Sequence, residues 1–345
     1  MNIAICTAQI PFMYGGAEIH VAGLRDALRA QGHRVEVVSL PFKWYPTVRI
    51  LESALAWRLI DLTEANGVPI DLVICTKFPS WAVRHPRKIT WLIHQHRQAY
   101  DLYGTPLSDF SNNPDDNETR RRIVDIDRRG LGECRALFAI SDNVAGRLKR
   151  STGLDAETLH VPINLSGLLV ESYGDYIFSV SRLDRAKRID LLLDALAAAG
   201  EPYRAVIAGD GPEAAELRKR AHRLRIDHRV SFVGRIDDHD VVAYYNNARA
   251  VYNCPVDEDF GLVTVEAFSA AKPVLTASDA GGVLELVEHE RTGIVADAAR
   301  PDLIAAGLRR LLDDEPLARS LGAEAKLRVR DIRWELVVER LLAHA

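Results

Sequence analysis

The sequence predicts an α/β protein built from two domains, each with a parallel β-sheet. Its 345 residues are more than one hydrophobic core usually serves. Apolar runs of strand length alternate with helix-length segments from end to end, which is the pattern of parallel strands joined by crossovers. The strand-like runs are nearly continuous in apolar residues, as expected when helices cover both faces of a sheet.

The first series of strands and helices occupies residues 1–165, which we expect to form one domain. A strand at 2–8 is followed by an amphipathic helix at 18–30. Further strands are expected at 34–40, 71–76, 89–93 and 136–140. The polar string 109–116 predicts a loop, and we expect a helix to follow it from Glu118 to about Arg135.

The second series occupies residues 170–330 and forms the second expected domain. Its strands are expected at 176–180, 205–208, 230–233, 250–252 and 273–276, and residues 161–167 connect it to the first series. Both series have the alternation of a Rossmann-like domain. Two such domains facing each other leave a cleft at the carboxyl ends of their strands, where ligands bind in folds of this kind.

Bulk composition argues against several classes of protein. The net charge of −4 argues against general nucleic-acid binding. No stretch approaches the roughly 20 apolar residues needed to span a bilayer, and the first residues are typical of a strand rather than of a signal peptide. The four cysteines are scattered without metal-type pairing. We therefore expect a cytoplasmic protein with reduced cysteines.

Basic and aromatic residues are concentrated in the N-terminal half. Residues 1–165 carry a net charge of +2 and the remainder −6. The stretch 72–100 lacks acidic residues and contains Trp81 and Trp91, and the stretch 43–58 is similarly mixed. Aromatic rings favour the headgroup zone and cations favour anionic lipid. One hypothesis is peripheral contact with the inner face of a membrane, or with a lipid-linked anionic acceptor; the alternative is an ordinary charged surface with partly buried tryptophans.

Two glutamates eight positions apart, Glu258 and Glu266, carry the most informative functional signal. They flank a loop and the start of an apolar helix. Gly261 lets the backbone turn tightly, and the N–H groups of Leu262 and Val263 would point from a helix N-terminus, a natural cradle for phosphate. A carboxylate on each side of that cradle could hold sugar hydroxyls. The competing interpretation is a solvated Glu258 and a helix-capping Glu266.

This segment resembles the E-x7-E motif of retaining glycosyltransferase family 4 (glycosyltransferase group 1), whose members have the two-domain GT-B fold. The resemblance covers the C-terminal half almost throughout and the N-terminal half in patches. Its other motifs are Gly15-Gly16-Ala17-Glu18, Ser181-Arg182-Leu183 with Lys187-Arg188, Gly209-Asp210-Gly211-Pro212, Val233-Gly234-Arg235 and the region of Gly293. It also implies that residues 331–345, with a helix at 334–342, return to the first domain.

The resemblance implies roles for four residues of the second domain. Arg182 and Lys187 would bind the pyrophosphate of the donor, because a guanidinium grips phosphate in bidentate fashion and an ammonium adds a compact charge. Glu258 would contact hydroxyls of the donor sugar, and Glu266 those of the ribose. We assign Arg182, Lys187 and Glu258 to catalysis. A solvated basic pair is the competing interpretation of Arg182 and Lys187.

Further donor contacts are expected from turns that contain glycine. Gly15 and Gly16 follow the first strand and could turn backbone N–H groups toward a phosphate or a sugar. Gly209 and Gly211 allow a close backbone approach after a later strand. In the resembled family the region matching Arg235 and Ile236 lines the nucleotide base, and the diphosphate cradle matches Phe260, Gly261, Leu262 and Val263.

His94 and His96 lie just past the strand expected at 89–93. In the resembled family a histidine at this place lies beside the donor sugar, and we assign His94 to catalysis because it is nearer the strand end. A His-x-His pair could instead hold a metal ion, although no convincing third ligand lies nearby, and one of the two could be a structural histidine bonded to a loop carbonyl. His96, Arg97 and Asp101 are expected on the acceptor side.

We expect chemistry without a metal or a cofactor. No Asp-x-Asp pair lies where a metal-dependent transferase would need one, and Asp237-Asp238 falls at an expected helix start, where a capping role is the better interpretation. Arg182, Lys187 and the helix N-terminus would then replace the cation.

The resulting hypothesis is a retaining transferase that moves a hexose from a nucleotide diphosphate to an acceptor hydroxyl in polysaccharide or glycolipid assembly. Uridine and guanosine donors stay open. Mannose is favoured because residues 94–101 resemble mannosyltransferases of polysaccharide assembly, and the acceptor is expected to be a saccharide or a lipid-linked oligosaccharide. The alternatives are a nucleotide-sugar epimerase or hydrolase of the same fold, and a non-catalytic sugar-binding subunit.

Overall fold

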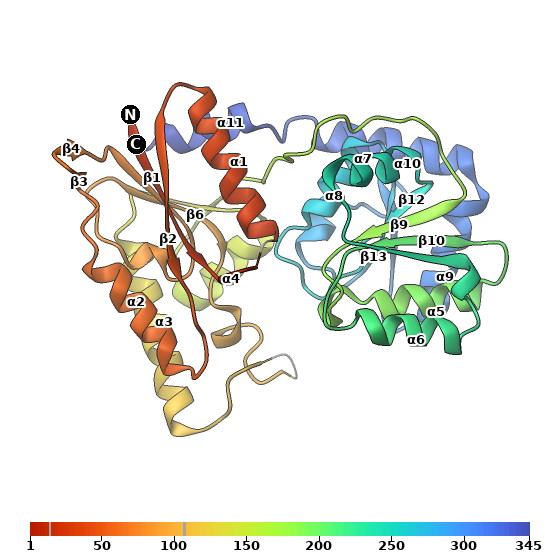
Figure 1. Cartoon of the computed structure of the whole chain (residues 1–345), viewed down its shortest axis with the longest axis horizontal. Coiled ribbons are helices and arrows are strands. Elements are labelled where there is room, and N and C mark those ends of the chain that lie inside the picture. Colours follow the sequence, from red (N-terminus) through yellow and green to blue (C-terminus); the bar gives the residue numbers. More distant parts are fainter. Residues whose placement is uncertain (14, 106–107) are drawn as a thin grey trace. The chain divides into compact units, whose positions relative to one another are not determined.

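The computed structural model describes residues 1–13, 15–105 and 108–345. The chain forms two compact units: residues 1–162 together with 332–345, and residues 163–331. Each unit is an α/β layer structure around one parallel six-stranded sheet (Figure 1). The predicted fold class, two parallel-sheet α/β domains, is therefore confirmed.

The sheet of the first unit has the strand order β2-β1-β5-β6-β7-β8, and all its pairs are parallel. The strands are β1 (Asn2–Gln9), β2 (Arg34–Pro41), β5 (Leu72–Lys77), β6 (Lys88–His94), β7 (Ala136–Ala139) and β8 (Glu157–Thr158). The central strands are apolar and buried along almost their whole length, because helices cover both faces of the sheet.

The helices of the first unit form two layers (Figure 1). Helix α1 packs on α11, and α2 packs on α3, on the other face. Their bounds are α1 (Gly16–Ala30), α2 (Val48–Leu59), α3 (Pro114–Gly132), α4 (Asp142–Thr152) and α11 (Trp334–Leu342); β3 (Glu64–Ala65) and β4 (Val68–Pro69) form a small hairpin, and η1 (Ser80–Ala82) and η2 (Arg97–Ala99) are short 3-10 turns. The predicted helix at 334–342 is thus present and belongs to this unit.

The sheet of the second unit has the order β11-β10-β9-β12-β13-β14, again with all pairs parallel. In chain order this is 3-2-1-4-5-6, the strand order of a dinucleotide-binding Rossmann domain. The strands are β9 (Tyr176–Val180), β10 (Arg204–Ala208), β11 (Val230–Gly234), β12 (Ala250–Tyr252), β13 (Val274–Ala277) and β14 (Gly293–Ala296).

The helices of the second unit also lie on both faces of its sheet (Figure 1). Helices α5, α6 and α9 cover one face, and α7, α8 and α10 the other. Their bounds are α5 (Ile189–Ala199), α6 (Ala214–Arg223), α7 (Asp238–Asn247), α8 (Leu262–Ser269), α9 (Pro301–Asp313) and α10 (Glu315–Val329), with 3-10 turns η3 (Arg185–Lys187), η4 (Asp227–Arg229) and η5 (Gly282–Glu285).

Helix α3 begins four residues earlier than predicted, at Pro114 rather than Glu118. The Asn113 side chain accepts a hydrogen bond from the Asp116 backbone N–H at 2.9 Å and caps the helix. Proline is well suited to the first helical position, and acidic residues are favoured in the first turn. The polar string therefore contains the start of a helix as well as a loop.

The tryptophans of the stretch 72–100 are core residues. Trp81 and Trp91 are both 0% exposed, so their rings are not available to a lipid surface. Trp81 donates a hydrogen bond from Nε1 to Asp127, and Trp91 donates one to the Leu159 carbonyl, each at 2.9 Å. The hypothesis that these two tryptophans contact a membrane is therefore wrong. A stretch rich in basic and aromatic residues does not by itself show which of its rings are buried. None of the helices among the described residues has the length and apolarity needed to cross a bilayer.

Candidate active site

The strand order of the second unit reverses between β9 and β12. At such a switch point the connections leave in opposite directions, so a crevice opens beyond the carboxyl ends of the two strands. The segment after β9 contains Arg182 and Lys187, and the segment after β12 contains Glu258. Three residues predicted to be catalytic therefore lie at one edge of this sheet.

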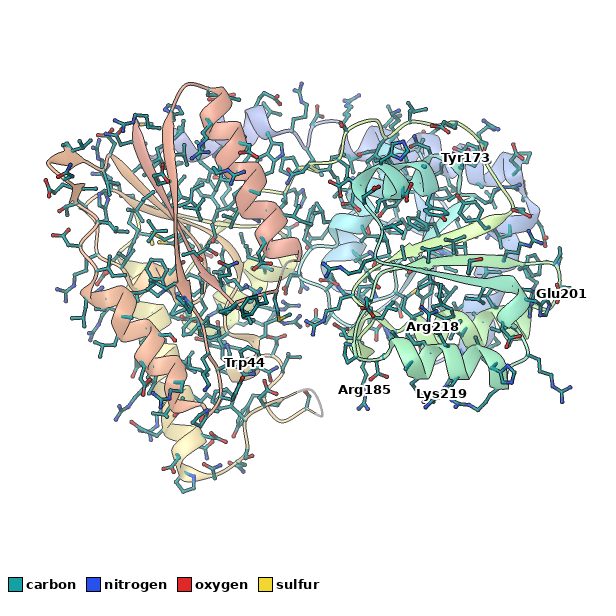
Figure 2. All side chains as sticks on the ribbon, in the orientation of Figure 1. Trp44, Tyr173, Arg185, Glu201, Arg218 and Lys219 are labelled. Atoms are coloured by element: carbon teal, nitrogen blue, oxygen red, sulfur yellow. The ribbon has the colours of Figure 1, made fainter. Side chains whose placement is uncertain are left out.

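Lys187 and Glu258 form a hydrogen-bonded ion pair at this switch point. Their side chains are 27% and 23% exposed, respectively. The pair is therefore accessible from solvent but partly shielded by protein, which strengthens its electrostatic attraction relative to a fully exposed pair. Arg185, two residues before Lys187, projects away from the unit instead (Figure 2), with a side chain that is 82% exposed.

Arg188 holds Lys187 in place. Its φ of +50° interrupts the helical path between η3 and α5, so Lys187 lies at the end of η3, before α5 begins. The guanidinium of Arg188 donates to the Cys254 and Pro255 carbonyls and to both carboxylate oxygens of Asp279. Arg188 thereby ties the segment after β9 to the segments after β12 and β13, a role that its place beside Lys187 in the motif did not indicate.

The backbone of Glu258 is fixed by the loop that follows β13. Its N–H donates to the Ala280 carbonyl at 3.1 Å, and its carbonyl accepts from the Gly282 N–H at 2.8 Å. A Cβ at Gly282 would lie 2.4 Å from the Asp259 carbonyl oxygen, so only glycine fits there. This contact explains Gly282 as a structural support for the Glu258 loop.

Helix α8 starts from Gly261, which has a φ of +90°. A Cβ at this position would also lie 2.6 Å from Cγ2 of Val283. The turn places the N–H groups of Leu262 and Val263 in the first turn of α8, where backbone donors lack acceptors within the helix. The side chain of Phe260 is only 3% exposed, so of this predicted donor-site residue only the backbone is available to a ligand.

Glu266 lies on α8, one turn into the helix, and accepts a hydrogen bond at 2.7 Å from the hydroxyl of Tyr245 on α7. Burial raises the pKa of Glu266 to about 7, and the Tyr245 hydrogen bond opposes this rise because it stabilises the ionised carboxylate. The position within the helix argues against the competing interpretation of Glu266 as a helix cap.

The remaining segments at this edge place Arg182 and two predicted glycines. Arg182 is about half exposed, with Nε 3.9 Å from Asp184. A Cβ at Gly209 would lie 1.9 Å from the Ser181 carbonyl oxygen, and one at Gly211 would lie 2.4 Å from that of Leu183. The close approach that we predicted for a ligand is therefore made by the chain's own 181–183 loop, which the two glycines hold on either side of Arg182.

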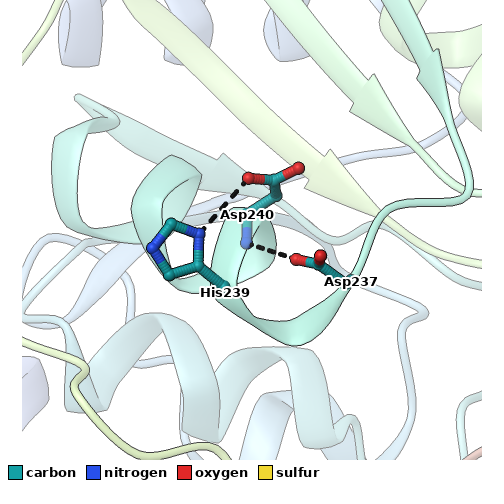
Figure 3. A group of neighbouring side chains, drawn as sticks. All are labelled: Asp237, His239 and Asp240. Atoms are coloured by element: carbon teal, nitrogen blue, oxygen red, sulfur yellow. Dashed lines mark hydrogen bonds and ion pairs between the residues drawn. The ribbon is translucent and has the colours of Figure 1, made fainter.

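Arg235 and Ile236 lie in the connection between β11 and α7, also at the carboxyl edge of the sheet. Arg235 is exposed and Ile236 half-buried. The next residue, Asp237, caps α7 by accepting from the Asp240 N–H at 2.9 Å (Figure 3), as predicted for this aspartate. His239 and Asp240 lie beside it (Figure 3) and complete an exposed group with metal-ligand atoms, whose geometry the helix cap already explains.

In the first unit the strand order reverses between β1 and β5. Glu18, on α1, accepts from the Gly15 N–H at 2.9 Å, and its other carboxylate oxygen lies 3.6 Å from Nζ of Lys77 at the end of β5. The N–H of Gly15, which we expected to face a ligand, is therefore occupied by Glu18. A Cβ at Gly16 would meet nothing within 4 Å, so the turn is open on that side.

The two histidines after β6 differ in environment. His96 is 9% exposed and its ring lies among Phe42, Phe78 and Phe110. Burial lowers its pKa to about 4, so the ring is neutral at physiological pH. His94 is only half-buried, and its Nδ1 lies 2.6 Å from the Gln95 carbonyl oxygen. His94 is thus the more accessible of the pair, and His96 is part of the core.

Asp127, on α3, binds the loop that follows β6 and contains His96. It is fully buried and accepts from Gln95 at 2.9 Å, from Tyr100 at 2.7 Å and from Trp81. Burial raises the pKa of Asp127 to about 6, against the effect of its three donors. Gln95 and Tyr100 lie on either side of His96 in the chain, so this carboxylate ties the loop that carries His96 to α3. No motif in the sequence indicated this role.

Arg97 and Asp101, predicted on the acceptor side, pair with each other. Both Nε and Nη2 of Arg97 donate to one carboxylate oxygen of Asp101, at 2.8 and 2.6 Å. Arg147 of α4 lies 3.8 Å from the same oxygen. The acidic side chain is therefore placed between two guanidinium groups.

The fold and the site define a two-domain α/β protein of the Rossmann type with charged residues at the switch point of each sheet. Residues 169–328 match the family model described as "Glycosyl transferases group 1". This match covers the second unit almost throughout, and the whole chain has the two-domain GT-B fold of glycosyltransferases. It is a glycosyltransferase, and the donor of this class of enzyme is a nucleotide sugar.

Individual relatives agree with this assignment. A D-inositol 3-phosphate glycosyltransferase of Jonesia denitrificans is 27% identical over 95% of this chain and 90% of its own length. A GDP-mannose-dependent alpha-(1-6)-phosphatidylinositol monomannoside mannosyltransferase of Mycobacterium tuberculosis is 32% identical over 39% of this chain and 37% of its own. The crystal structure of Anabaena Alr3699/HepE in complex with UDP and glucose has the same fold, with a TM-score of 0.74, 19% identity and 99% coverage of both chains.

Proposed function

We propose that this protein is a retaining, family 4-type glycosyltransferase that moves a hexose from a nucleotide diphosphate to an acceptor hydroxyl. The observation that carries this proposal is the Lys187–Glu258 ion pair at the β9/β12 switch point. It combines a cation suited to a diphosphate with a carboxylate suited to sugar hydroxyls, beside the N-terminus of α8. A sugar diphosphate needs these groups in this proximity.

The donor is bound through its diphosphate first. Lys187, Arg182 and the N–H groups at the start of α8 would share the phosphate charge, which grows as the bond to the sugar breaks. Because Lys187 binds Glu258 in this structure, phosphate would take over part of that interaction. Glu258 would then be released to accept hydrogen bonds from the hexose hydroxyls, and Glu266 would accept from the ribose.

Retention of the anomeric configuration follows if a phosphate oxygen of the leaving group removes the proton of the acceptor hydroxyl. The new bond to the anomeric carbon then forms on the face from which the diphosphate departs. A carboxylate that accepts hydrogen bonds from the hexose hydroxyls is occupied by them, so the proposed contact of Glu258 with the sugar gives it an orienting role and not that of a nucleophile. Proton NMR of the first product would show the same anomeric configuration as the donor, and an inverted product would contradict the proposal.

We also propose that transfer needs no divalent metal. Arg182, Lys187 and the α8 N-terminus supply the positive potential that a cation would supply in a metal-dependent transferase. Turnover measured in EDTA should equal turnover in MgCl₂ within about two-fold, whereas complete loss in EDTA that Mg²⁺ or Mn²⁺ restores would overturn this part of the proposal.

For the acceptor we propose a saccharide or lipid-linked oligosaccharide, in polysaccharide or glycolipid assembly, and mannose as the first hexose to test. The Mycobacterium relative is named for GDP-mannose and a phosphatidylinositol mannoside, whereas the Anabaena structure contains UDP. Both bases therefore belong in the donor panel.

A peripheral membrane contact is proposed for the edge of the first unit formed by the segments 10–13 and 41–53. Phe12 is fully exposed and Tyr45 is 60% exposed, and Trp44 lies in the same segment after β2 (Figure 2). A cavity of about 610 Å³ opens there, lined by Ile10, Pro11, Pro41, Phe42, Lys43, Trp44, Tyr45, Arg49, Glu52 and Ser53. Co-sedimentation with anionic but not neutral vesicles, abolished in Phe12→Ser/Tyr45→Ser, is expected; absence of binding at low salt excludes the contact.

The first test is a thermal-shift panel of UDP, GDP, ADP and their common sugar conjugates, with and without Mg²⁺. Stabilisation by one diphosphate without metal fixes the base. The matching sugar donor is then incubated with candidate acceptors. A product formed from the donor alone would favour an epimerase or hydrolase, and a donor that binds without turnover would favour a non-catalytic sugar-binding subunit.

A further inference from the structure

Tyr245 connects two helices of the second unit through a single hydroxyl. Its side chain is 0% exposed, and its ring packs edge-on against Phe178 of β9 with the centroids 5.1 Å apart. From this fixed position on α7 the hydroxyl donates to Oε2 of Glu266 on α8 at 2.7 Å. Nothing in the sequence motifs pointed to Tyr245.

Glu266 has a limited set of partners. Among the residues that the structure describes, Tyr245 is the one side chain that donates a hydrogen bond to Glu266. Glu266 is also partly exposed to solvent. An ionised carboxylate offers about four acceptor positions on its two oxygens. One oxygen is therefore engaged by the phenol, and acceptor positions are left for a ligand.

We infer that Tyr245 is a positioning residue: it fixes the rotamer of Glu266 by binding Oε2, so that the free positions of the carboxylate accept from the vicinal hydroxyls of the donor's ribose. This inference rests on the proposed function, which places the ribose at Glu266. It assigns to Tyr245 a part of the enzyme's selectivity for ribonucleotides.

A glutamate has three rotatable side-chain bonds, and ordering them on binding costs affinity. Tyr245, immobilised by its packing on Phe178, removes part of that cost before the nucleotide arrives. The phenol O–H is a donor toward the carboxylate, so it also stabilises the ionised form that can accept from both ribose hydroxyls. Asp238 acts against this as a like charge.

The decisive experiment compares wild type with Tyr245→Phe and with Tyr244→Phe as a matched control. Tyr244 is the preceding residue on α7 and also packs on Phe178, with the rings stacked 5.4 Å apart, but its hydroxyl makes no described contact to Glu266. Calorimetry would give the affinities for the nucleoside diphosphate chosen by the thermal-shift panel, for its 2′,3′-dideoxy analogue and for inorganic pyrophosphate.

Wild type and Tyr244→Phe should prefer the ribonucleotide over the dideoxy analogue by roughly ten-fold or more, the value of one or two hydrogen bonds to a charged group. Tyr245→Phe should reduce this preference by about five- to ten-fold while leaving pyrophosphate affinity within two-fold. The same loss is expected in Glu266→Gln. The variant that combines Tyr245→Phe with Glu266→Gln should lose little more ribose preference than either single variant, because the two side chains act as one unit.

Two results would overturn the inference: an unchanged ribose preference in Tyr245→Phe, or an equal loss of pyrophosphate affinity, which would show a merely structural role. If Tyr245→Phe does not fold, Glu266→Asp replaces it, since this variant keeps the buried tyrosine and shortens the carboxylate by one methylene; a retained ribose preference there contradicts the inference. A wild type that binds no nucleoside diphosphate would instead refute the proposed function.

Discussion

Lys187 and Glu258 are 71 positions apart in the chain and form a direct ion pair at the carboxyl ends of two adjacent parallel strands. Each residue was predicted on separate grounds, one for the diphosphate and one for the sugar. Their pairing means that neither acts independently: a diphosphate that binds Lys187 must change the environment of Glu258.

Replacing Lys187 by Ala should lower kcat by at least about 10²-fold, since it removes a charge that stabilises the departing diphosphate. The melting temperature should change by only a few degrees, because partly exposed ion pairs contribute about 0–1 kcal/mol to stability. Steady-state kinetics and thermal denaturation measure both. Arg185→Ala is the control, being a neighbouring cation with an 82% exposed side chain. Full activity of Lys187→Ala would exclude its role.

Substitution of Arg188 by Lys, or of Asp279 by Asn, should displace Lys187 indirectly, because the contacts of Arg188 fix the segment that carries Lys187. A lysine cannot reproduce the fork that binds two carbonyls and a carboxylate at once. We expect a loss of about 1–3 kcal/mol in the free energy of unfolding for Arg188→Lys and a roughly ten-fold rise in donor KM. Asp279→Asn, with the carbonyl contacts intact, should show a smaller effect in the same direction. A wild-type donor KM in Arg188→Lys would show that the Arg188 contacts to Cys254, Pro255 and Asp279 are not needed for donor binding.

Glu266 should make donor binding and stability respond oppositely to pH. Its folded pKa is about 7, above the ordinary value of 4.5, so the folded state holds a proton that the unfolded state has released between these values. Its contribution to stability is therefore present at low pH and lost as pH rises through 7. The ionised form accepts from ribose hydroxyls, so affinity for the nucleoside diphosphate should rise over the same range.

Glu266→Gln provides the comparison for this prediction. The amide keeps an oxygen that can accept from Tyr245 and has no charge to bury. Relative to wild type it should gain about 1–3 kcal/mol of stability between pH 5 and pH 8, measured by urea denaturation, and it should bind the nucleotide with less dependence on pH. Parallel stability curves for the two proteins would contradict the assigned pKa.

Asp127→Asn should destabilise the first unit. Three donors, from Trp81, Gln95 and Tyr100, converge on the carboxylate, and an asparagine would replace one acceptor oxygen by a further donor. A buried donor left without an acceptor costs about 1–3 kcal/mol, so we expect a loss of about 2–4 kcal/mol by chemical denaturation. Asp125→Asn, exposed on the same helix, should change stability by less than about 0.5 kcal/mol. Equal effects of the two variants would refute the network.

The alternation of apolar strands and amphipathic helices was sufficient to predict two parallel α/β domains, and the strands at 176–180 and 250–252 coincide with β9 and β12. The positions of these strands and helices follow from local patterns, because each strand or helix is formed by residues that are neighbours in the sequence. The two-residue β8 was missed since its pairing depends on β7, and α3 was started late because the Asn113 cap was not recognised in a polar string.

The sequence by itself was enough to predict the candidate site residues, because Arg182, Lys187, Glu258 and Glu266 lie in motifs whose spacing is local. Only the tertiary structure decided how these groups are held. Arg188 reaches Asp279 across 91 positions and Tyr245 reaches Glu266 across 21, and the tryptophans at 81 and 91 proved to be core. Such contacts depend on which strands are neighbours in the sheet and which faces are covered, and a linear pattern contains no distances between segments that meet only after folding.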